Sequence, residues 1–64
     1  MTKIQATNRL ITVYEKYEDI INALESNPQW IGLTEIKYIK SESGRREREM
    51  KKITINTDHI IEIY

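Results

Sequence analysis

Residues 30–56 read WIGLTEIKYIKSESGRREREMKKITIN, and this stretch decides how the chain folds. Residues 30–39 are rich in isoleucine, leucine and aromatic side chains, which favours a strand. After a charged segment, residues 50–56 return to β-branched side chains. Two such segments joined by a short turn that contains glycine predict an antiparallel β-hairpin.

The register of this hairpin follows from its turn and its charges. A three-residue loop, residues 42–44, places Gly44 at the left-handed position that such loops require. The pairs that result are Glu35–Lys51, Lys37–Glu49, Leu33–Ile53 and Ile31–Ile55. Opposite charges directly across a sheet stabilise it by a few tenths of a kcal/mol. A two-residue loop would shift the pairing by one position and place Glu35 opposite Lys52.

Both faces of the predicted hairpin carry apolar groups. One face is apolar near the base, and we expect it to be ion-paired near the tip. The other face carries Trp30, Thr34, Ile36 opposite Met50, and Tyr38 opposite Arg48. Large apolar groups on both faces exceed what one small, half-solvated strand pair needs.

Length and composition bound the class of protein. A chain of 64 residues forms one domain and buries only about 60% of its unfolded surface, so its margin of stability is thin. It has no cysteine, which excludes disulfides and thiolate metal sites and leaves oligomerisation as a means of stabilisation. Charged residues make up 31% of the chain but sum to zero. A neutral total argues against general attraction to phosphate, although a local patch remains compatible with it.

The sequence carries no targeting or membrane signal. The first five residues, MTKIQ, lack the apolar run of a signal peptide. No stretch approaches the roughly 20 apolar residues that span a bilayer. We therefore expect a soluble, cytoplasmic protein without a membrane partner.

The first half of the chain predicts a strand pair and a helix. Residues 3–6 and 10–14 are strand candidates around a turn at Asn8, a residue that tolerates the left-handed conformation; one bent strand with a bulge there is the alternative. A helical stripe follows, formed by Tyr17, Ile20, Ile21 and Leu24. No good capping residue precedes it, and Asn27 with Pro28 ends it.

The end of the chain completes the predicted fold. Residues 56–59 interrupt the apolar pattern, and their Asn and Asp side chains favour a single 3₁₀ turn. Residues 60–64 are a last short strand. The order β-β-α-β-β-β predicts an α+β domain spanning residues 1–64, with one short helix packed on a curled, mainly antiparallel five-stranded sheet. These are also the parts of an SH3-like small barrel, a likeness of architecture alone.

The sequence offers no set of residues for catalysis. His59 is the only histidine, and neither a cysteine nor a spaced set of carboxylates accompanies it. A zinc site needs further ligands, and an acid–base site needs a positioned partner. We interpret His59 as a turn residue and expect neither an enzyme nor a cofactor nor a metal.

The surplus apolar face suggests a binding or assembly module. We expect contact with a protein partner or a second copy through Trp30, Ile36, Tyr38, Arg48 and Met50. Aromatic side chains, methionine and arginine are enriched at interfaces. The other interpretation, burial of these groups inside a curled sheet, remains open at this point.

The runner-up function is a nucleic-acid-binding regulator. Its contacts would be Arg45, Arg46, Arg48, Lys51 and Lys52 on a two-stranded ribbon. Against it, Glu42, Glu47 and Glu49 lie in the same segment and would repel phosphate. Alternating signs are more often typical of a solvated hairpin that resists aggregation.

Overall fold

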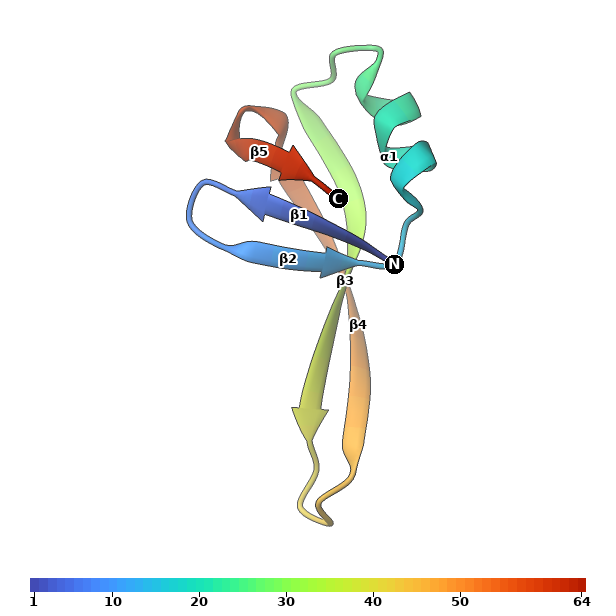
Figure 1. Ribbon diagram of the computed structural model, residues 1–64, viewed down its shortest axis with the longest axis vertical. Helices are drawn as coiled ribbons and strands as arrows, with labels where there is room; N and C mark the ends of the chain where they lie inside the picture. The colour runs from blue at the N-terminus through green and yellow to red at the C-terminus, as the bar shows by residue number, and fades with distance from the viewer.

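The computed structural model describes all residues 1–64 as a single antiparallel sheet with one helix (Figure 1). The elements in chain order are β1 (Thr2–Ala6), β2 (Leu10–Val13), α1 (Tyr17–Leu24), β3 (Trp30–Lys40), β4 (Arg46–Asn56), the 3₁₀ turn η1 (Thr57–His59) and β5 (Ile60–Ile63). The strands lie in the order β4-β3-β2-β1-β5. The predicted α+β class and element order are confirmed.

The sheet is open. β4 and β5 lie at opposite ends of the strand order and are not paired with each other, so the barrel does not close. β1 and β2 cross the direction of β3 steeply (Figure 1), and β2 meets β3 at one registered pair, Val13 with Glu35. The short contact between β2 and β3 leaves the parts of β3 and β4 nearest their turn outside the small domain.

The core lies on one face of the sheet, which we call the inner face. Four of its side chains are almost fully buried: Ile4, Ile11, Val13 and Ile20. Ile20 comes from α1, so the helix covers the inner face. The cluster is completed by Ala6, Ile31 and Leu33, with Leu24, Ile53, Ile55, Ile60 and Ile63 packed against it.

The helix relies on this packing, as its sequence predicts. Lys16 precedes it and makes no side-chain capping bond. Of the predicted stripe, Ile20 is buried but Tyr17 is half exposed. The helix ends at Leu24, and Asn27 follows with a φ of 52°. Asn27, and not Asn8, is therefore the asparagine in the left-handed region.

The 3₁₀ turn η1 joins parts that are distant in sequence. At η1 the Asn56 Oδ1 accepts a hydrogen bond from the backbone of Asp58 at 3.0 Å, which confirms the predicted 3₁₀ turn. The Thr57 hydroxyl donates to the carbonyl of Pro28 at 2.6 Å, and the Thr57 N–H donates to Gln29 at 2.9 Å. These bonds fix the start of β3 against the end of β4.

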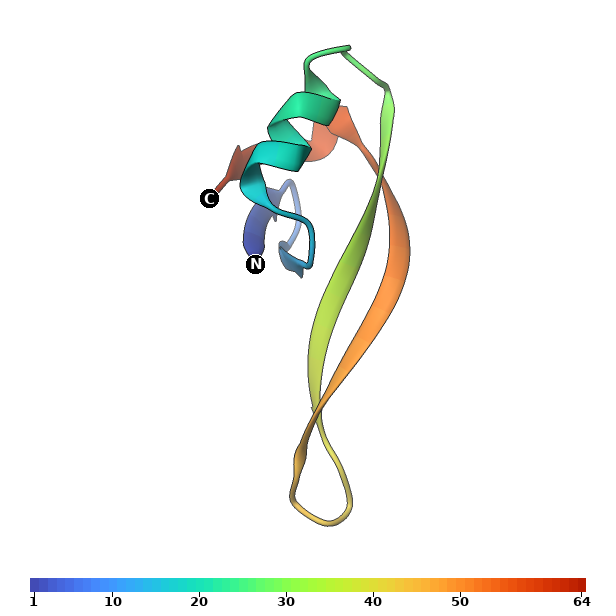
Figure 2. The ribbon, with the colours of Figure 1, turned by 90° about the vertical axis from the view of Figure 1, so that its right-hand side faces the viewer.

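The β3–β4 hairpin adopts the three-residue loop and the register expected from it. Gly44 has a φ of 83°, its N–H donates to the Ser41 carbonyl, and the Ser41 N–H donates to Arg45. The pairing runs from Trp30–Asn56 to Lys40–Arg46 and includes all four predicted pairs. The strands are longer than their apolar segments alone indicate. The hairpin extends far beyond the domain, and the whole molecule measures 44 × 22 × 18 Å (Figure 2).

The expected ion pairs along the hairpin do not form. Lys51 lies opposite Glu35 in the ladder, yet the only salt bridge joins Arg9 Nη1 to Glu35 Oε2 at 3.4 Å. Arg9 approaches from the β1–β2 turn, a long-range neighbour that local pairing rules do not reveal. The exposed lysines remain solvated, as exposed ion pairs contribute little.

The single helix is eight residues long and is neither long nor apolar enough to cross a membrane.

We expect Ile20→Ala to destabilise the fold by about 2–5 kcal/mol, the usual cost of truncating a buried isoleucine. Ile20 is 1% exposed and is the one fully buried side chain of α1. Ile61→Ala is the matched control because Ile61 is 67% exposed, so its change should stay within roughly 0.5 kcal/mol. Urea denaturation followed by circular dichroism measures both, and equal effects would contradict this placement of the core.

Candidate docking surface on the hairpin

The hairpin separates its charges by face. Side chains alternate across a strand and directly paired residues share a face, so even-numbered residues of β3 and β4 lie together. We call the side opposite the inner face the outer face of the hairpin. It carries Thr34, Ile36, Tyr38, Lys40, Arg46, Arg48, Met50 and Lys52.

No strand residue on this outer face is acidic. Its four charged side chains are all basic: Lys40, Arg46, Arg48 and Lys52. The carboxylates Glu35, Glu47 and Glu49 lie on the inner side with Lys37 and Lys51. Glu47 and Glu49, which share a segment with the arginines, therefore lie on the other side of the strand from Arg46 and Arg48. Glu42 lies in the loop.

The residue pairs on the outer face are the pairs of the β3–β4 ladder that are not joined by backbone hydrogen bonds. Thr34 donates its N–H to Glu15 Oε1 at 2.8 Å, and its carbonyl accepts from the Tyr14 N–H at 2.9 Å. Thr34 and Lys52 are therefore not hydrogen-bonded to each other. Bonded and non-bonded pairs alternate, so Ile36–Met50 and Tyr38–Arg48 are also non-bonded pairs, in which side chains approach more closely.

Glu15 fixes the point where the hairpin leaves the domain. Its second oxygen accepts from the Thr34 hydroxyl at 2.9 Å, and its backbone carbonyl accepts from the buried Thr2 hydroxyl at 2.7 Å. The carboxylate thus continues the ladder where β2 ends at Val13. These bonds fix the position of Thr34, the first residue of the outer face.

The structure brings four of the five expected partner-binding residues together. Ile36 lies beside Met50, and Tyr38 beside Arg48. Ile36 is only 4% exposed, whereas Tyr38 and Met50 are 55% and 43% exposed. Ile36 therefore supports the surface, and the other three residues are open to a partner.

The exposed surface continues onto the domain. The Tyr38 hydroxyl lies 3.7 Å from the Met1 sulfur. Arg48 shares a shallow depression of about 350 Å³ with Met1, Tyr14 and Asp19. Met1 and Tyr14 are both exposed apolar side chains. They extend the apolar part of the outer face toward the start of α1.

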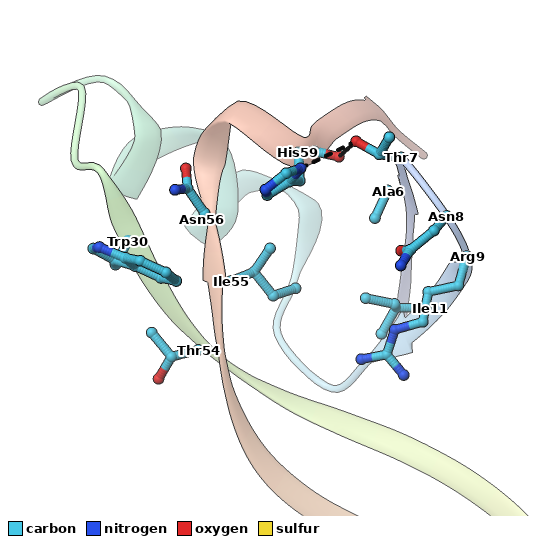
Figure 3. A pocket seen from close by; sticks show the side chains of 10 residues that line it. All are labelled: Ala6, Thr7, Asn8, Arg9, Ile11, Trp30, Thr54, Ile55, Asn56 and His59. Atoms are coloured by element: carbon cyan, nitrogen blue, oxygen red, sulfur yellow. Dashed lines mark hydrogen bonds between the residues drawn. The ribbon is translucent and has the colours of Figure 1, made fainter.

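Trp30 lies apart from this group. It pairs with Asn56 at the opposite end of the hairpin, about 20 Å from Ile36 at roughly 3.3 Å per residue. It lines an open depression of about 450 Å³ between β4 and the β1–β2 turn. Figure 3 shows Trp30 and Asn56 on one side of this depression and Asn8 and Arg9 on the other. The sequence pattern gives no signal for it, because the open sheet creates it.

The only histidine lies at the rim of the same depression (Figure 3). Its Nδ1 is 3.3 Å from the Thr7 hydroxyl, which also lies 3.2 Å from the His59 carbonyl. No carboxylate bonds the imidazole, so the pair lacks the group that orients a catalytic histidine. His59 ends η1, as its interpretation as a turn residue predicts.

The residues expected for nucleic-acid binding divide between three places. Arg46, Arg48 and Lys52 lie on the outer face, Lys51 on the inner side and Arg45 in the loop. No group of three or more His, Cys, Asp or Glu residues could hold a metal ion.

Comparison of the chain with models of protein families, with curated proteins and with solved structures gave no match.

Truncating Ile36 and Met50 in turn should show which of the two side chains stabilises the fold and which only forms the surface. We expect Ile36→Ala to cost about 2–4 kcal/mol because Ile36 is buried, and Met50→Ala to cost less than about 1 kcal/mol because Met50 is 43% exposed. Chemical denaturation of the two variants measures this difference. A larger cost for Met50→Ala would mean that Met50 holds the fold and is not free for a partner.

Proposed function

We propose that this protein is a non-enzymatic binding module that docks its hairpin onto a partner macromolecule. The observation that carries the proposal is the projecting hairpin, whose outer face exposes Tyr38, Arg48 and Met50 to solvent. These side chains contribute nothing to the core cluster. Exposed aromatic, methionine and arginine side chains are enriched at interfaces.

The free edge of β4 supports the same proposal. β4 lies at one edge of the sheet and is 11 residues long. By the alternation of the ladder, the backbone N–H and C=O groups of Arg48, Met50 and Lys52 point away from β3. A partner can therefore be held by side chains and by backbone bonds at once. The charges on β4 limit uncontrolled strand pairing.

Charge restricts how a second copy can be the partner. Residues 35–52 hold seven basic and four acidic side chains, net +3, and the remainder holds three basic and six acidic ones, net −3. Two outer faces in contact would place charged side chains of the same sign against each other, since all four charged side chains of this face are basic. A second copy would instead place its hairpin against the acidic domain of the other.

Site-specific photo-crosslinking in the host cell tests docking. We expect a photoreactive residue at position 38 or 50 to form adducts, because Tyr38 and Met50 lie on the proposed contact. The controls replace Leu10 and Ile61, which are 49% and 67% exposed but lie elsewhere. Adducts from the control positions alone, or from none of the four, would rule the docking role out. The mass and nuclease sensitivity of an adduct identify a second copy, another protein or a nucleic acid.

Sedimentation at millimolar concentration tests whether the partner is a second copy of the chain. A species of twice the 7.6 kDa chain mass, reduced to monomer in a Tyr38→Glu, Met50→Glu variant and by added salt, would support it. Glutamate at the buried Ile36 would disturb folding, so the variant leaves Ile36 unchanged. A wild type that stays monomeric would exclude self-association, and the partner would then be a different macromolecule.

A further inference from the structure

No cation of the outer face forms a salt bridge or lies directly opposite a carboxylate in the ladder. On the inner side of the hairpin, Lys37 and Lys51 lie opposite carboxylates. On the outer face Lys40 lies directly opposite Arg46, Arg48 opposite Tyr38, and Lys52 opposite Thr34. The one salt bridge of the protein involves none of them.

This arrangement works against the stability of the hairpin. Like charges directly opposite each other in a sheet are destabilising. Arg46 and Arg48 also share a face two residues apart. A sequence that places its inner lysines opposite carboxylates but places Lys40 opposite Arg46 breaks a local rule, and such breaks are expected at functional sites.

We propose that the outer face of the hairpin binds single-stranded nucleic acid, an inference that rests on the proposed docking function. Arg46, Arg48 and Lys52 would contact phosphates along β4. The first two are spaced about 6.7 Å apart, two strand residues at roughly 3.3–3.4 Å each, which is comparable to the step between phosphates of an extended strand. Lys40 adds a fourth cation beside Arg46.

Apolar side chains between the cations provide surfaces for bases. Tyr38 lies between Ile36 and Lys40 on β3, and Met50 lies between Arg48 and Lys52 on β4. Tyr38 is more than half exposed. Unpaired bases stack on such side chains whatever their sequence. A row of cations with apolar groups between them therefore matches a strand whose phosphates and bases are both accessible.

The composition of this face favours a single strand over a duplex. Ribbons that read a duplex groove present amide, hydroxyl or guanidinium groups to base edges. Here the centre of the face is Tyr38 with Ile36 and Met50, and an aromatic ring needs an unstacked base. The acidic side chains of β4, Glu47 and Glu49, point to the other side, so the carboxylates at this face are Glu15, which bonds Thr34, and Asp19, which shares a depression with Arg48.

Fluorescence anisotropy with labelled oligo(dT), oligo(U) and a matched duplex tests this inference. We expect binding of the single strands at about 50 mM salt and at least tenfold weaker binding of the duplex. Each phosphate contact contributes about −0.7 to the slope of log K against log salt, so three contacts give a slope of about −2.

Neighbouring lysines provide a matched pair of variants. Lys52→Ala and Arg48→Ala should each weaken binding several-fold and make the salt slope shallower by about 0.7. Lys51→Ala removes the same charge from the other side of the strand and should change little. Tyr38→Ala should weaken binding about tenfold without changing the salt slope, as loss of a stacked base predicts. All four side chains are exposed, so we expect the variants to fold, and circular dichroism checks this.

Several results would overturn the inference. These are no binding of any oligonucleotide, equal losses for Lys51→Ala and Lys52→Ala, or binding that is indifferent to Tyr38→Ala. Equal or tighter binding of dextran sulfate, of polyglutamate or of vesicles with anionic phospholipid would also overturn it, since each indicates attraction to negative charge alone. Photo-crosslinks from positions 38 and 50 to a protein would then leave the docking function standing without a nucleic-acid partner.

Discussion

The register of the β3–β4 hairpin is the constraint on which the rest of the structure depends. It is set by a three-residue loop in which Gly44 occupies the left-handed region. Side chains alternate with a period of two, so a shift of one residue would move every side chain of β4 to the other face. Glu47 and Glu49 would then lie beside Tyr38, and the separation of charges would be lost.

Local signals in the sequence were sufficient for most of the fold. The loop at Gly44, the helical stripe around Ile20 and the asparagine-led turn at Asn56 each act over a few residues. What the sequence did not reveal depends on how β1 and β2 cross β3. That crossing brings Arg9 to Glu35 and leaves the barrel open, and it is specified by no single segment.

Part of the candidate surface could be predicted from the sequence. Tyr38, Arg48 and Met50 follow directly from the register, and the structure adds that Ile36 is covered. The even positions of the two strands already hold only basic charges in the sequence. This stays hidden when residues 41–49 are read as one mixed charged segment and not as two faces.

The hairpin is held at its base by the Glu15 carboxylate, the Val13–Glu35 pair and the packing of Ile31 and Leu33, whereas its tip takes no part in the core cluster. Its reach therefore varies independently of the domain. Adding two residues to each strand would carry the tip roughly 7 Å further and keep the same side chains outward. Adding one residue to each strand would keep the pairing of the strands, but the side chains of the tip would then point to the opposite faces. Natural variants of this hairpin should therefore differ in length by even steps per strand.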